Sequence, residues 1–309
     1  MNALTPQVPL AVRALGKRYG NVQVIRDLDL EVTPGAIHGL VGLNGSGKTT
    51  TLECILGLQS FNAGSISVLG YAPNELYRAR GRIVGIFDTP SLHPNLTVRQ
   101  SLQHARLLCE HPRRSYEEVE ELLGIGRYRG FRIRHLSLGN RRRASIAQAL
   151  LGNPEVILLD EPFNGLDAEG VEDVLRLITT LNREYGTAFL LSSHQLPYLE
   201  QVCSHLAVLH HGHIAINGAV EQLFARQQTR LLIRCEPLPQ ALALLHGAGH
   251  GGFALDPDGT SLSGELGSGT AAELNRLLVN GDIAVHELVQ QRASLTSLFQ
   301  QITSAPESH

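Results

Sequence analysis

The sequence predicts an α/β fold in which helices pack on a mostly parallel β-sheet. Short apolar segments alternate with segments of helical spacing, and one apolar segment runs through a glycine-rich turn into a helix. EVILLD (155–160) precedes the helical AEGVEDVLRLITTLNREYG, which is followed by TAFLLSS and QLPYLEQVC. Strands joined by helices of this length form parallel sheets because each helix returns the chain to the same edge.

Two further regions precede residue 155. Residues 10 to 34 alternate apolar and polar side chains around the turn signals YGN and TPG, which predicts an N-terminal antiparallel β-subdomain. From about residue 90 to 150 the spacing becomes helical in LTVRQSLQHARLL, SYEEVEELLGI and RRRASIAQALL. We therefore expect a helical insertion between the first and second halves of the sheet.

The composition changes near residue 228, which predicts a first domain over residues 1–227 and a second over 228–309. The second region carries 4 arginines and 8 acidic residues, and it is rich in glycine around residue 250. The sequence predicts a strand at RLLIRCE and a helix at PLPQALALL. It predicts a second helix and a second strand within GTAAELNRLLVNGDIAVHELV. This small α+β domain is expected to be a dimerising or stabilising appendage rather than a regulatory ligand site.

Charge and cysteine content exclude several classes of protein. The formal net charge is −3, so no nucleic-acid partner is expected. The four cysteines form no CxxC pair, which argues against a zinc framework or a disulfide scaffold. No apolar run reaches the roughly 18 residues that cross a bilayer, and MNALTPQVPL lacks a signal pattern. Any work at a membrane is expected to go through a partner.

The segment GLNGSGKT (42–49) has the composition and context of a phosphate-binding loop. Its glycines let successive N–H groups point at phosphate oxygens, beside the positive end of the following helix. Lys48 is one of only two lysines among 26 basic residues, and its compact ammonium suits the β- and γ-phosphates. The predicted nucleotide contacts here are Gly42, Leu43, Asn44, Gly45, Ser46, Gly47, Lys48, Thr49 and Thr50.

VILLDEP places two carboxylates at the carboxyl end of a buried strand, where open α/β sheets bind their ligands. We expect Asp160 and the hydroxyl of Thr49 to hold Mg²⁺. Glu161 is positioned to polarise an attacking water, as a general base.

Five motifs follow one another along the chain, namely the glycine-rich loop, LSLGN, VILLDEP, NGLD and SSH. Their order and spacing resemble those of the ATP-binding subunit of ABC transporters over residues 10 to 225. Within this family, the motifs are most similar to those of the drug and antibiotic-peptide exporter type. The resemblance implies a P-loop NTPase fold, the cofactors ATP and Mg²⁺, and ATP hydrolysis. It also implies a second copy of the chain or a homologous ATPase subunit, an integral-membrane permease, and a place on the cytoplasmic face of the membrane.

The resemblance also assigns roles outside the phosphate loop. Tyr19 would stack on adenine, while Ser137 and Gly139 would contact the γ-phosphate of ATP held by the other subunit. The chain departs from the family's LSGGQ signature at Leu138 and Asn140. These departures are expected to alter hydrolysis or coupling.

Three further family positions carry functional side chains. Asp88 stands where the family's Q-loop has a glutamine, and its carboxylate is a predicted Mg²⁺ ligand and catalytic group. A solvated loop acid without a catalytic part is the alternative for Asp88. His194 matches the switch histidine that hydrogen-bonds the γ-phosphate. Asp167 matches the aspartate that crosses the dimer interface.

Two clusters of side chains could be interpreted either as functional sites or as ordinary surface. His210, His211 and His213 lie too close together on a strand and turn to face one ion, so a metal site is not expected there. Arginines surround the signature segment, either as a solvated face or to balance ATP phosphates or dock a partner. These are Arg127, Arg129, Arg132, Arg134, Arg141, Arg142 and Arg143.

The favoured function is a motor subunit that dimerises around two ATP and drives export of a hydrophobic compound or peptide through a separate permease. The segment RASLTSLFQQITS resembles the ending of exporter subunits in this family. A soluble ATPase of a cofactor-assembly or remodelling complex is the alternative, as is an exporter subunit for a metal or lipid.

Overall fold

The computed structural model describes residues 8–89, 92–109, 112–225, 230–256, 258–266, 269–291 and 294–304. The chain divides into two compact units, Met1–Val220 and Glu221–His309. The boundary expected between residues 227 and 228 falls among 226–229, outside the described residues. Each unit has a hydrophobic core of its own.

A six-stranded sheet forms the centre of the first unit, and its strand order is β5-β6-β7-β3-β8-β9. Every neighbouring pair is parallel except β8 and β9, which form an antiparallel hairpin. The predicted mostly parallel sheet is confirmed. The strands are β3 (Ile37–Val41), β5 (Ile83–Ile86), β6 (Val156–Asp160), β7 (Ala188–Ser193), β8 (His205–His210) and β9 (His213–Ala219).

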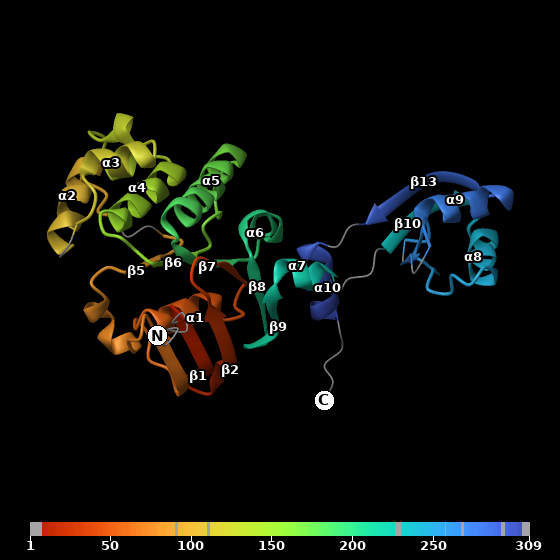
Figure 1. Ribbon diagram of the computed structural model, residues 1–309, viewed down its shortest axis with the longest axis horizontal. Helices are drawn as coiled ribbons and strands as arrows, with labels where there is room; N and C mark the ends of the chain where they lie inside the picture. Colours follow the sequence, from red (N-terminus) through yellow and green to blue (C-terminus); the bar gives the residue numbers. More distant parts are fainter. Residues whose placement is uncertain are drawn as a thin grey trace, which may run out of the picture. The chain divides into compact units, whose positions relative to one another are not determined.

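A second, antiparallel sheet of the order β2-β1-β4 comes from the N-terminal region, as predicted. Its strands are β1 (Leu10–Tyr19), β2 (Val22–Val32) and β4 (Ala63–Val68). Helix α1 (Lys48–Ile55) shares one core with apolar side chains of both sheets. Figure 1 shows α1 beside β1 and β2. The burial of Leu52 and Ile55 in this core fixes the start of α1, and with it the phosphate loop.

Three helices with serine or threonine caps make up the predicted helical insertion. They are α2 (Val98–Leu108), α3 (Tyr116–Leu122) and α4 (Leu138–Leu150), which contact one another and lie together in Figure 1. Thr97, Ser115 and Ser137 each accept a hydrogen bond from a backbone N–H three residues on, which satisfies an otherwise orphaned donor. The guanidinium of Arg99 joins α2 to α3 through Glu117 and Glu120.

The remaining elements of the first unit connect these layers. Helix α5 (Ala168–Tyr185) follows β6 and is capped at its C-terminus by Gly186, and α6 (Leu196–Val202) follows β7. In the described part of this unit, short 3₁₀ segments lie at Pro73–Ala79, Gly126–Tyr128 and Ile133–His135. The helices predicted from AEGVEDVLRLITTLNREYG and QLPYLEQVC are therefore confirmed.

The second unit contains a four-stranded antiparallel sheet of the order β11-β12-β10-β13 with two helices in its core. Strand β10, helices α8 and α9 and strand β13 confirm the predicted strand, helix, helix and strand. The short strands β11 and β12 were not predicted because glycines and turn residues dominate their region. The bounds are α7 (Val220–Ala225), β10 (Arg230–Glu236), α8 (Leu238–Gly247), β11 (Ala254–Leu255), β12 (Leu262–Glu265), α9 (Ala271–Asn280), β13 (Ala284–Gln291) and α10 (Leu295–Ser304).

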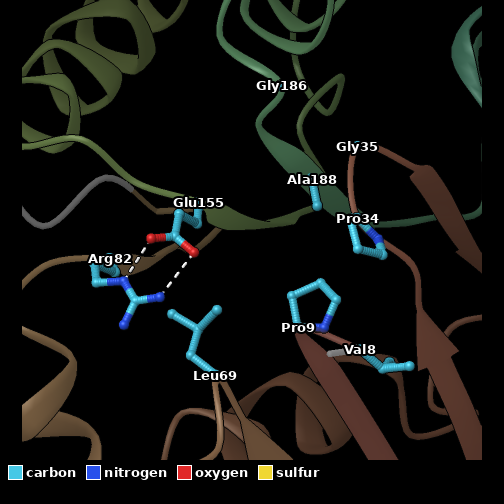
Figure 2. A pocket seen from close by; sticks show the side chains of 9 residues that line it. All are labelled: Val8, Pro9, Pro34, Gly35, Leu69, Arg82, Glu155, Gly186 and Ala188. Atoms are coloured by element: carbon cyan, nitrogen blue, oxygen red, sulfur yellow. Dashed lines mark hydrogen bonds and ion pairs between the residues drawn. The ribbon is translucent and has the colours of Figure 1, made fainter. Parts of the chain in front are cut away.

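A surface cavity lies near the amino ends of the central strands. Figure 2 shows its lining, in which the guanidinium of Arg82 pairs with the carboxylate of Glu155 through two hydrogen bonds. Glu155 precedes β6, and Ala188 begins β7. Ligands of open α/β sheets bind outside the carboxyl ends of the strands, so the predicted phosphate site belongs at the opposite edge from this cavity.

The buried histidine of β3 links the fold to pH. The His38 ring stacks on His205 of β8, with 5.7 Å between the ring centroids. The pKa of His38 is lowered to about 4, mainly by burial and also by the charge of His205, while a hydrogen bond with Asn217 acts in the opposite direction. His38 is therefore neutral in the folded protein near pH 7.

We expect acid to destabilise the first unit through His38. The unfolded chain binds a proton at His38 near the ordinary pKa of about 6.5, whereas the folded chain binds it only near pH 4. The stabilising contribution is present above pH 6.5 and is lost as the pH falls, by about 2 kcal/mol at pH 5. Calorimetric unfolding of the wild type and His38→Asn between pH 7 and 5 measures this slope. Equal slopes in the two proteins would contradict the assignment.

Candidate functional site

The phosphate loop joins strand β3 to helix α1, in the strand-to-helix context that the motif requires. Gly45 and Gly47 adopt positive φ angles of 80° and 107°. A Cβ at Gly42 would lie 2.7 Å from the carbonyl oxygen of Leu209, so backbone from β8 leaves no space for a side chain there. The loop conformation thus depends on glycine at these positions.

The ammonium of Lys48 lies inside this loop, and only 6% of the side chain is exposed. It donates to the carbonyl oxygens of Gly42 at 2.8 Å and Leu43 at 3.3 Å. A carboxylate oxygen of Glu161 lies 3.2 Å from the same nitrogen. Lys48 and Glu161, 113 positions apart in the printed sequence, therefore form a buried ion pair at the carboxyl ends of β3 and β6.

Asp160 contacts hydroxyl groups from both neighbouring elements. The Thr49 hydroxyl donates to one carboxylate oxygen at 2.9 Å, and the Ser192 hydroxyl donates to the other. Thr49 and Asp160 thus present oxygen atoms side by side at the start of α1. Such hard oxygen ligands fit Mg²⁺, which binds proteins through one or two carboxylates or hydroxyls and keeps several waters.

Ser192 is a site residue that the sequence interpretation missed. Its backbone and hydroxyl oxygens accept from the N–H of Glu161 at 3.0 Å and 3.2 Å, while its hydroxyl also donates to Asp160. The available signal was its position in LLSSH, two residues before His194 at the end of β7. Ser192 thereby holds both acidic residues that follow β6.

Glu161 lies between a lysine and a histidine. Its second carboxylate oxygen is 3.0 Å from Nδ1 of His194, and 13% of the Glu161 side chain is exposed. The backbone of Glu161 has a φ of 47°, a left-handed conformation that costs a non-glycine residue energy and occurs often at functional sites. Lys48, Glu161 and His194, all predicted from sequence motifs, are thus brought together in one cluster.

Asp88 follows β5, and its contacts run to two other residues. The Asp88 carboxylate accepts from Arg142 at 3.2 Å and from Asn164 at 3.4 Å, and its side chain is 45% exposed. The role of Asp88 as a Mg²⁺ ligand stays a prediction. Part of its predicted loop, residues 90 and 91, lies outside the described residues.

The signature segment starts helix α4. The Ser137 hydroxyl accepts from the backbone N–H of Asn140 at 3.3 Å and from its side-chain amide at 3.1 Å. A Cβ at Gly165 would lie 2.8 Å from Leu138 Cδ2, so Leu138 packs against the NGLD segment. Within the described part of the chain, no hydrogen bond joins Ser137 or Gly139 to the phosphate loop.

The remaining predicted residues lie at element ends. Tyr19 ends β1 and is 44% exposed, and the Lys17 ammonium is 4.6 Å from its ring centroid. Asp167 caps α5 by accepting from the N–H of Gly170 at 2.9 Å. Their proposed contacts with adenine and with a second subunit stay predictions.

The arginines near the signature do not share one environment. Arg142 is buried, Arg143 pairs with Asp173 of α5, and Arg134 donates to Asn95. The solvated-face interpretation is therefore wrong for Arg142. Among the described residues, no group of three or more His, Cys, Asp or Glu side chains gathers as a metal-binding cluster.

Comparison with known proteins places this site in a family. Residues 25–164 match the family model described as ABC transporter. The uncharacterized ABC transporter ATP-binding protein YdbJ of Bacillus subtilis (strain 168) is 34% identical over 298 residues, which cover 96% of this chain and 96% of YdbJ. This chain belongs to the ABC transporter ATP-binding proteins.

Two further comparisons agree with the family assignment. The bacitracin transport ATP-binding protein BcrA of Bacillus licheniformis is 32% identical over 291 residues, covering 92% of this chain and 94% of BcrA. A solved structure of the ATP-binding subunit of an ABC transporter is 29% identical, with a TM-score of 0.64 over 70% of this chain and 92% of that one. The chain is thus an ATP-binding subunit of an ABC transporter and an ATPase with a P-loop NTPase fold. No helix in the described residues has the length and apolar character to cross a membrane.

We expect Glu161→Gln to separate ATP binding from hydrolysis. An amide cannot act as a base, so the turnover number should fall by about 10²- to 10⁴-fold. The same change removes the negative charge beside Lys48, so ATP should bind as tightly as to the wild type, or more tightly. Steady-state phosphate release and a fluorescent-nucleotide titration measure the two effects. Turnover near the wild-type rate would exclude Glu161 as the base.

Proposed function

We propose that this subunit is the motor of an exporter, in which two copies close around two ATP and drive a separate membrane permease. The observation that carries the proposal is the cluster of Lys48, Thr49, Asp160, Glu161 and His194 at one edge of the sheet. It contains a phosphate-binding cation, an oxygen pair suited to Mg²⁺, and a carboxylate for water activation. These are the parts that phosphoryl transfer to water uses.

Binding of ATP begins at the phosphate loop. The loop N–H groups and the start of α1 favour the phosphate charge, and Lys48 provides a buried ammonium beside them. Phosphate oxygens compete with Glu161 for this ammonium, because Glu161 is its carboxylate partner here. The proposed Tyr19 stacking on adenine adds about 1–3 kcal/mol, the range measured for aromatic stacking on nucleic-acid bases.

Hydrolysis needs a positioned water and stabilisation of charge on the γ-phosphate. Thr49 and Asp160 would hold Mg²⁺, which would supply positive charge to the phosphate oxygens. Glu161, once displaced from Lys48, accepts a hydrogen bond from the water in line with the γ-phosphate. His194 contacts the Glu161 carboxylate through its Nδ1. A neutral imidazole has one N–H, so this ring donates either to Glu161 or toward the phosphate, and Glu161 has to turn to the water before the ring can donate toward the phosphate.

A second copy supplies the other face of the ATP site. Ser137 caps an exposed helix start that can bind an anion, and the partner of its hydroxyl in the described residues is Asn140. We assign Ser137 and Gly139 to the γ-phosphate of ATP held by the partner copy. We also assign Asp167, which caps α5, to the interface between the two copies.

The transport direction and cargo rest on relatives and on the C-terminal segment. Two relatives bear the name bacitracin transport ATP-binding protein, one from Bacillus licheniformis and one from Enterococcus faecalis. The RASLTSLFQQITS segment resembles exporter subunits. These observations favour export of a hydrophobic compound or peptide over work in a soluble remodelling complex. The subunit would then act on the cytoplasmic face of the membrane, bound to its permease.

Inverted membrane vesicles test the proposal with bacitracin as the probe. The chain is co-expressed with a candidate permease, chosen as a polytopic membrane protein whose gene adjoins its own. Export corresponds to ATP-dependent accumulation of labelled bacitracin inside such vesicles. We expect accumulation with the wild type and none with Lys48→Ala, which lacks the phosphate-binding ammonium.

The distribution of the chain provides the matching control. It should sediment with these membranes and be released by an alkaline wash, while the permease stays behind. A chain that neither binds the membranes nor copurifies with the permease would contradict the motor assignment. Accumulation that is equal in wild type and Lys48→Ala would contradict a transport role for this ATP site.

A further inference from the structure

We propose that Arg142 is a positioning residue for hydrolysis, which ties the loop of Asp88 to the backbone of Glu161. The inference rests on the proposed role of Glu161 and goes beyond it. The pair Asp88–Arg142 then forms a mechanical link between the predicted Q-loop and the carboxylate that activates water. A shift of the Asp88 loop would be passed to Glu161 through one rigid guanidinium.

The contacts of Arg142 define this link. Its Nη1 donates to the carbonyl oxygen of Glu161 at 2.8 Å, and its Nη2 donates to the carbonyl oxygen of Asp88 at 2.9 Å and to the Asp88 carboxylate at 3.2 Å. A planar guanidinium holds both acceptors in a fixed relative geometry. Arg142 lies in α4, Asp88 follows β5, and Glu161 follows β6. The Arg142 side chain therefore joins one helix to the ends of two strands.

The burial of Arg142 shows how specific the arrangement is. Only 2% of the side chain is exposed, and its Nε has no hydrogen-bond partner among the described residues. Burial lowers the pKa of the Arg142 guanidinium, while the charge of Asp88 and then those of Asp160 and Glu161 raise it. A buried cation is costly without such acceptors. If residue 142 only packed α4 against its neighbours, an apolar side chain would serve equally well.

The bond to Glu161 acts where the backbone is strained. Glu161 has a φ of 47°, and this conformation directs its side chain toward Lys48 and His194. The Arg142 hydrogen bond holds the carbonyl of the same residue, and the Ser192 oxygens hold its N–H. In the described residues, Asp88 is the one predicted site residue whose side chain Arg142 contacts, so Arg142 acts through Asp88 and through the backbone of Glu161.

The test is Arg142→Lys, with Arg143→Lys as a matched control. Lysine keeps the charge but lacks the fork that joins two acceptors. Misplacing a reacting group by about 1 Å can cost 10²-fold, so we expect kcat to fall about 10- to 100-fold with KM for ATP changed by less than about twofold. Arg143 is the next residue of α4, and it pairs with Asp173 away from Asp88 and Glu161. Arg143→Lys should keep a wild-type kcat.

An unchanged kcat in Arg142→Lys would overturn the proposal. So would a rise in KM that matches the fall in kcat/KM, because it would indicate a damaged binding site. Nucleotide binding and the thermal midpoint show whether Arg142→Lys is folded. If Glu161→Gln retains turnover, the assignment of Glu161 fails; if Glu161→Gln is inactive and Arg142→Lys is normal, only the positioning role fails.

A double-mutant cycle with Asp88→Asn tests the link itself and does not depend on the stability of one variant. Asp88 is half-exposed, so its amide variant should fold. If the two residues act as one unit, adding Asp88→Asn to Arg142→Lys should lower kcat little further. Multiplicative losses would show that Asp88 acts by a separate route and would overturn the link.

Discussion

The ion pair between Lys48 and Glu161 is the interaction on which the site depends. The pair needs the phosphate loop and the end of β6 at one edge of the sheet, and the order β6-β7-β3 puts only one strand between them. That intervening strand contributes Ser192, which holds Asp160 and the backbone of Glu161. A buried charge left without its partner is strongly destabilising, so the pair constrains both elements.

In the proposed mechanism, the same pair couples nucleotide binding to catalysis within one chain. Lys48 is saturated by two carbonyl oxygens and a carboxylate, so a phosphate reaches it by displacing Glu161. Displacement frees the carboxylate for a water near His194. Arg142 limits how far the Glu161 backbone moves during this exchange. Part of the binding energy of ATP would thereby break the Lys48–Glu161 ion pair and leave the carboxylate able to accept a proton from water.

The sequence predicted the parts of the site that short motifs encode. The phosphate loop could be identified because it joins an apolar strand to an apolar helix, and both show as apolar runs in the sequence. Asp160 and Glu161 could be identified because they directly follow a second apolar run. The strand order could not be predicted, since β7 lies between β3 and β6 although it follows both in the chain. Ser192 was therefore missed, because its role follows from that neighbourhood.

Arg142 escaped prediction for a different reason. It stands in a run of three arginines, and which of them turns inward depends on how α4 packs on the sheet. The strands β11 and β12 were missed because they are two and four residues long and lie in a glycine-rich region. The helical pattern of α5, by contrast, was strong enough to define its whole length.

The most direct test of this account is a structure of the wild-type subunit with Mg²⁺ and an ATP analogue that cannot be hydrolysed. The account predicts that Lys48 leaves Glu161 for the β- and γ-phosphates, with Ser137 and Gly139 of a second copy on the γ-phosphate. A structure in which the nucleotide is bound while Lys48 and Glu161 stay paired would contradict it.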